Sequence, residues 1–185
     1  DMLFAAATDH RYMDIGHLLD YINKAFEALD RAGWDQAPVV LASLAPVFAG
    51  ASRQEETNEW QQPVNLVGIL QDAFARLPGS IAEGQGRTWD ITAHWNRLVE
   101  TLLGDDPQAT SDALLAALED GASFEELAQV VAYGALRRVA QVHISNEFGD
   151  WNTVHHTYTY ANALHQDEHL SRPLPEYPGD PPAST

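Results

Sequence analysis

The chain is organised around residues 136–169, which read Leu136-Arg-Arg-Val-Ala-Gln-Val-His143-Ile-Ser-Asn146-Glu147-Phe-Gly149-Asp150-Trp151-Asn-Thr-Val-His155-His156-Thr-Tyr-Thr-Tyr-Ala-Asn162-Ala-Leu-His165-Gln-Asp-Glu168-His169. Apolar residues at helical spacing fill the first part, and Gly149 then permits a left-handed turn. Asp150 is placed to cap a second helix at about 151–165. This pattern of helix, break and helix predicts two antiparallel neighbours.

A capping box begins the first of these helices, because Ser123 is followed three residues later by Glu126. The predicted apolar face of this helix comprises Leu127, Val130, Val131, Leu136, Val139 and Val142. Further helices are expected at about 13–31, 35–48, 64–76, 88–103 and 108–120. The expected caps are Asp35 and either Thr88 or Asp90, with a kink or stop at Pro46.

The predicted fold class is all-α, a single domain of seven to eight helices in antiparallel hairpins over residues 1–170. Residues 78–86, which contain three glycines and a proline, form the clearest predicted loop. Residues 171–185 are rich in proline and are expected to form an extended or disordered tail.

Composition narrows the class of protein. The 27 acidic and 10 basic residues give a formal net charge of −17, which argues against nucleic-acid binding. The absence of cysteine excludes thiolate and iron–sulfur cofactors on this chain. Neither a membrane span nor a signal peptide is apparent, so a cytoplasmic location is expected. The chain begins at Asp1 rather than Met, which is compatible with a processed or partial protein.

Five of the eight histidines lie in the focal stretch, and imidazole serves both as a proton carrier and as a metal ligand. In a continuous helix, His143 and Glu147 would lie one turn apart on one face. We therefore predict a divalent-metal site, with iron favoured, whose ligands are His143, Glu147, His155 and His165. The alternative is that these side chains are polar groups hydrogen-bonded to neighbouring helices.

Other polar residues are candidates for catalysis or binding. The predicted catalytic residues are His155, His156, Asn162, Lys24 and Glu27, and the predicted cofactor-binding residues are His17, Arg138 and Trp151. The helix at 13–31 carries His17, Asp20, Lys24 and Glu27 in one polar stripe. That stripe is either a solvated face with local ion pairs or, if buried, a source of general acid–base groups. Arg138 would either hold an anionic group or pair with surplus carboxylates.

Residues 16–34 and 146–166 resemble the helical region of large bacterial proteins that also carry a Rieske-type [2Fe–2S] domain. The resemblance implies a redox protein whose cluster lies on another segment, because this chain has no Cys-x-His pair. Residues 121–131 are more weakly similar to helical hairpins of the carboxymuconolactone decarboxylase/AhpD-like group. The redox cysteines of that group are absent here, so its peroxidase chemistry does not carry over.

Three functions follow from these observations. The first is an oxidoreductase domain with the predicted metal site, acting on a small molecule that the sequence does not identify. The second is a non-catalytic acidic helical domain that docks a redox partner subunit. The third is a metal-free enzyme in which one histidine is the general base. A homo-oligomer is compatible with each of them.

Overall fold

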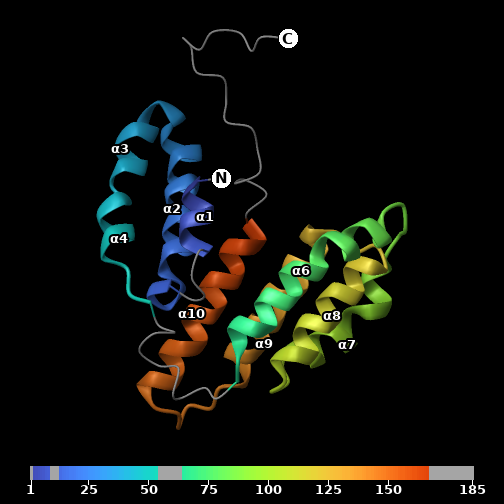
Figure 1. Ribbon diagram of the computed structural model, residues 1–185. Coiled ribbons are helices and arrows are strands. Elements are labelled where there is room, and N and C mark those ends of the chain that lie inside the picture. Colours follow the sequence, from blue (N-terminus) through green and yellow to red (C-terminus); the bar gives the residue numbers. More distant parts are fainter. Residues whose placement is uncertain (1, 9–12, 54–63, 167–185) are drawn as a thin grey trace, which may run out of the picture.

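The computed structural model describes residues 2–8, 13–53 and 64–166, and in these residues every regular element is a helix (Figure 1). The elements are α1 (Met2–Thr8), η1 (Met13–Gly16), α2 (His17–Ala32), η2 (Trp34–Gln36), α3 (Ala37–Ala42), α4 (Ala45–Gly50), α6 (Leu66–Gly84), α7 (Ile91–Leu102), α8 (Pro107–Glu119), α9 (Phe124–Gln141) and α10 (Phe148–His165). The predicted all-α, single-domain class with antiparallel packing is confirmed. The predicted tail at 171–185 lies outside the described residues.

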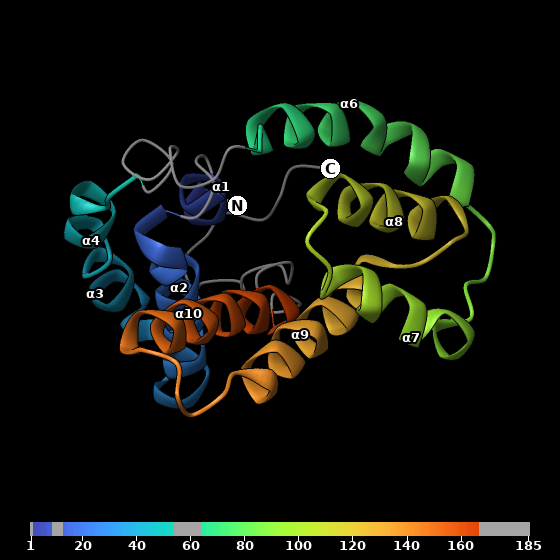
Figure 2. The same cartoon turned by 90° about the horizontal axis from the view of Figure 1, so that it is seen from below.

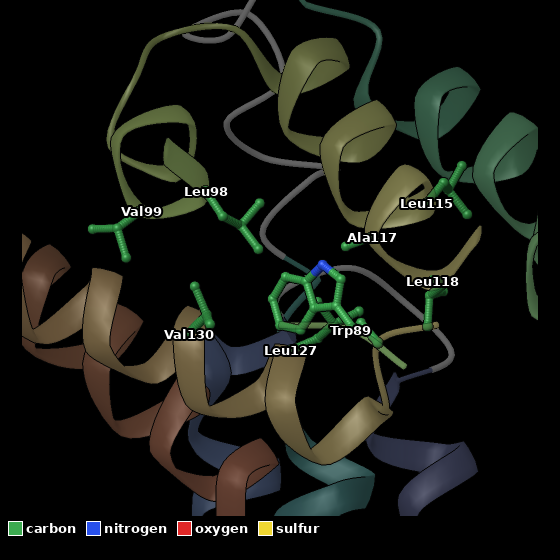
Figure 3. Close-up of a cluster of buried hydrophobic side chains, with 9 residues drawn as sticks. Trp89, Leu98, Val99, Leu115, Ala117, Leu118, Leu127 and Val130 are labelled. Atoms are coloured by element: carbon green, nitrogen blue, oxygen red, sulfur yellow. The ribbon is translucent and has the colours of Figure 1, made fainter. Parts of the chain in front are cut away.

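One hydrophobic cluster joins α7, α8 and α9 around Trp89, which is 6 % exposed (Figure 3). Its buried members are Trp89, Leu98, Val99, Leu115, Ala117, Leu118, Ala122, Leu127 and Val130. Local capping fixes where these helices begin. The side chain of Asp90 accepts hydrogen bonds from the Thr92 and Ala93 N–H groups, and Ser123 and Glu126 form the predicted capping box.

A second cluster lies between α1, α2 and the α3–α4 segment, and its buried members are Ala7, Leu18, Ile22, Ala25 and Leu44. The long helix α10 packs against both α9 and α2, and Figures 1 and 2 show it between them. It therefore connects the two halves of the molecule. Among the described helices, none combines the length and apolar composition that a membrane span requires.

The prediction of a loop at residues 78–86 is wrong, because α6 continues through Pro78 to Gly84. Packing against α8 explains the difference. The Ser80 hydroxyl donates a 2.8 Å hydrogen bond to the Glu119 carboxylate, and Gly84 lies directly against the Leu118 carbonyl group. Pro78 itself is exposed. Tertiary contacts thus hold a helix through residues whose local preferences favour a turn.

The segment predicted as one helix over 35–48 is two short helices instead, α3 and α4. Pro38 and Pro46 each lie in the first turn of one of them, where the missing N–H group costs nothing. Pro46 therefore begins a helix rather than ending one. Asp35 is not the cap, since it lies within η2 and Gln36 precedes α3. Leu136, predicted on the apolar face of α9, is 47 % exposed.

Candidate active site

Two histidines from distant parts of the sequence meet where α2 crosses α10. The ring centroids of His17 and His156 are 4.4 Å apart, and the rings are perpendicular. We call these two residues the imidazole pair. His17 also stacks on Tyr21, with centroids 5.5 Å apart. The Nε2 atom of His156 lies 3.1 Å from Asn152 Oδ1. In the tautomer with the proton on Nε2, this nitrogen donates to the Asn152 oxygen and Nδ1 is left as the basic nitrogen.

A strained turn positions His17 at the start of α2. Asp14 and Ile15 have φ angles of 48° and 59°, and Gly16 continues the left-handed conformation at 85°. A left-handed conformation costs a non-glycine residue about 1–2 kcal/mol. Two contacts with Ser52 hold the turn. The Asp14 N–H donates to the Ser52 carbonyl at 2.8 Å, and the Ser52 hydroxyl donates to the Asp14 carboxylate at 3.2 Å.

Burial and neighbouring charges shift the pKa values of Asp20 and His156 at this crossing. Partial burial raises the pKa of the Asp20 carboxyl, and the charges of Lys24 and His17 partly offset that rise. Partial burial lowers the pKa of His156, and the neighbouring His17 and His155 lower it further. Asp20 acts on His156 in the opposite direction. His156 is therefore neutral near pH 7 and can accept a proton.

Lys24 and Glu27 form an ion pair on the more exposed side of α2. The Lys24 ammonium lies 2.8 Å from a Glu27 carboxylate oxygen, which also accepts a 3.1 Å hydrogen bond from the buried Asn23 amide. The hydrogen bond from Lys24 lowers the pKa of Glu27. This arrangement matches the predicted local ion pair. A catalytic role for these two residues stays a prediction.

The predicted metal ligands do not converge. Helix α9 ends at Gln141, so the expectation that His143 and Glu147 share one helix face is wrong. His143 instead faces Ser145, whose hydroxyl lies 2.7 Å from its Nδ1 atom. Glu147 is the N-cap residue of α10, the role that the sequence assigned to Asp150.

The two remaining predicted ligands lie far apart on α10. His155 is exposed and rests near Trp151, at a centroid distance of 5.9 Å. His165 lies ten residues further along, about 15 Å up the helix axis. Its Nδ1 atom is buried and has no hydrogen-bond partner among the residues that the structure describes. Among the described residues, no three or more histidine, aspartate and glutamate side chains are arranged to hold a metal ion.

The other predicted residues have separate positions. Arg138 donates a 2.6 Å hydrogen bond to the Leu103 carbonyl group, at the end of α7. It therefore stabilises a helix terminus. Asn162 is half-buried on α10, six residues beyond His156. Trp151 lies in the first turn of the same helix.

Sequence reasoning missed Tyr21 and Asn152, although a usable signal existed. Tyr21 follows His17 by four residues, and Asn152 precedes His156 by four. Side chains at that spacing meet on one helix face, so each histidine could have been assigned its local partner. The contacts of Asp14 with Ser52 were also missed. They depend on the left-handed turn, which no sequence pattern indicates.

No family model, curated protein or solved structure matches this chain. The resemblance to the helical region of Rieske-domain proteins therefore stays a prediction.

Proposed function

We propose that the chain is an enzyme domain in which the imidazole pair transfers a proton to and from a small-molecule substrate. The observation that carries this proposal is the approach of His17 and His156, from α2 and α10, to 4.4 Å. Polar side chains at a contact between two helices are less stabilising than well-packed apolar ones. The left-handed Ile15 adds a further cost at the same place. Polar contacts and strained backbone of this kind are concentrated at functional sites.

His156 is the proposed general base. Its Nδ1 lone pair takes a proton from an acidic C–H or O–H group of the substrate, and the electron pair of that bond stays on the substrate. The imidazolium that forms is stabilised by the Asp20 carboxylate, whose charge raises the pKa of His156. The same nitrogen then returns the proton to the product. His17 is the second imidazole that contacts the substrate.

The net charge of −17 favours a neutral or cationic substrate over an anionic one. The metal-dependent oxidoreductase predicted from the sequence has less support, because its four ligands lie at separate places on the chain. Proton transfer is common to many oxidations, so the proposal is compatible with the redox setting that the resemblance implies.

The proposal is tested by hydrogen exchange into a substrate. A panel of neutral and cationic small molecules with acidic C–H groups is incubated with the protein in deuterated water, and deuterium incorporation is followed by NMR. We expect the wild type to accelerate exchange in at least one class of compound, and His156→Gln to slow it about 100-fold or more. His143→Gln is the matched control, because His143 is exposed, precedes α10 and contacts Ser145 instead of either histidine of the pair. Equal exchange rates in the two variants would refute the proposal.

A further inference from the structure

Within the described part of the chain, helix α6 exposes an apolar stripe to solvent. Its members are Val67, Leu70, Phe74 and Ile81, which are 44 %, 41 %, 67 % and 42 % exposed. Their spacing of three, four and seven residues places them within about 60° of arc on the helix. We call these four residues the α6 stripe. Figure 2 shows α6 along the outside of the molecule, beside α8.

The stripe runs into a surface groove at the end of α6. The groove has a volume of about 470 Å³ and lies between the last turns of α6 and the junction of α8 with α9. Ile81 belongs to both the stripe and the groove lining. Phe124, at the start of α9, lines the other side of the groove and is 61 % exposed. Ile81 and Phe124 thus place apolar side chains on the two sides of the groove, at the end of the α6 stripe.

The length of this surface fits a helix. Residues 67–81 span about 21 Å along α6, close to four helical turns. Apolar anchors at spacings of three, four and seven residues are the pattern by which one amphipathic helix lies against another. The groove at the end of the stripe would receive a large apolar side chain of the partner.

The charge around the groove selects the partner. Asp120 and Glu125 are exposed at the edge of the groove. Asp120 directly precedes the lining residue Gly121, and Glu125 directly follows Phe124. Neither carboxylate forms an ion pair within the described part of the chain. The chain as a whole carries −17. A second copy would bring the same charge and be repelled, whereas lysine and arginine on the edges of a partner helix would be attracted.

We propose that the α6 stripe and its groove bind a basic amphipathic helix of a partner protein. The inference does not depend on the imidazole pair, because neither α2 nor α10 contributes a residue to this surface. It goes beyond the proposed enzyme activity by giving the domain a docking site on its other half. The partner supplies an apolar face about four turns long, with lysine or arginine along its edges.

The probe for the test is a fluorescein-labelled 15-residue peptide with leucine at helical anchor positions and lysine on the edges. A second peptide replaces every lysine with glutamate. Fluorescence anisotropy measures the affinity of each peptide for the wild type and for the double variant Phe74→Gln/Ile81→Gln. We expect the wild type to bind the lysine peptide and the double variant to bind it at least tenfold more weakly. Phe148→Gln is the matched control, because Phe148 is 83 % exposed and lies outside this surface. The affinity of this variant for the lysine peptide should stay within twofold of the wild-type value.

Charge is tested separately with Asp120→Asn/Glu125→Gln, which should weaken binding and reduce its dependence on salt. The inference is overturned if the double variant at Phe74 and Ile81 binds as tightly as the wild type. It is equally overturned if the wild type fails to bind the lysine peptide or prefers the glutamate peptide. Sedimentation of the wild type should show a monomer. A dimer that disappears in Phe74→Gln/Ile81→Gln would mean that a second copy occupies the stripe.

Discussion

The close approach of α6 to α8 can be tested by adding one methyl group at Gly84. A Cβ atom at this position would overlap the carbonyl oxygen of Leu118 and would lie 3.2 Å from the Cα atom of Gly121. Both neighbours are backbone atoms, so rotation of a side chain cannot relieve the overlap. Gly79 on the same helix has no atom within 4 Å of such a Cβ atom. The pair Gly84→Ala and Gly79→Ala therefore separates helix propensity from packing.

The two effects have opposite signs and known magnitudes. Replacing glycine by alanine inside a helix stabilises it by about 1 kcal/mol, and this is the effect expected for Gly79→Ala. Overpacking costs typically about 1–3 kcal/mol, and an overlap with backbone belongs at the upper end. After the gain in propensity, Gly84→Ala should lower the free energy of unfolding by about 2 kcal/mol. The two variants should thus differ by about 3 kcal/mol.

Urea denaturation followed by circular dichroism at 222 nm measures these differences, with thermal unfolding as a second readout. For a chain of this length, 1 kcal/mol corresponds to about 2–4 °C in Tm. Gly84→Ala should therefore melt about 4–8 °C below the wild type, and Gly79→Ala about 2–4 °C above it. If both variants were stabilised to the same extent, α6 would not lie against the end of α8, and the correction of the predicted loop at 78–86 would fail.

Four further changes test other parts of the structure. Burial raises the pKa of the Asp20 carboxyl above 3.8. Its contribution to stability is therefore complete below pH 3.8 and is lost as the pH rises through the folded-state pKa. In urea denaturation, Asp20→Asn should be more stable than the wild type at pH 7 but not at pH 3. Burial lowers the pKa of His156, so stability should fall as the pH drops below 6.5, and His156→Gln should flatten this fall. Ser123→Ala removes the cap of α9 and should cost about 1 kcal/mol by urea denaturation. Trp89→Ala should cost about 3–5 kcal/mol in the same assay, and a smaller loss would show that the cluster of Figure 3 is not well packed.

The helix starts that could be predicted depend on local chemistry. Asp90 and Ser123 accept hydrogen bonds from N–H groups two or three residues further on, so the whole interaction lies within a few residues of sequence. The end of α6 could not be predicted in the same way. Its continuation past Pro78 depends on Ser80 reaching Glu119 on α8, which is a contact between distant segments.

The difference between local contacts and contacts between distant segments also explains which features of the site could be predicted. His17 and His156 were each identified as polar candidates, but no spacing rule relates residues on separate helices. Their meeting is a consequence of how α10 packs on α2. The predicted pairing of His143 with Glu147 failed for a local reason. Helix α9 ends at Gln141 with no glycine to mark its end, so the helical pattern was extended too far.

Helix α10 supports the proposal that function contributes to this part of the sequence, because it joins the two halves of the domain without large, fully buried side chains. It packs against both α2 and α9, yet none of its residues belongs to either hydrophobic cluster of the described chain. Its buried residues are the small Ala161 and Ala163, while His156 meets α2. Its larger side chains, such as Tyr158 and Leu164, are only half-buried. The polar contact of His17 with His156, two residues after the left-handed Ile15, is compatible with the proposed proton-transfer site.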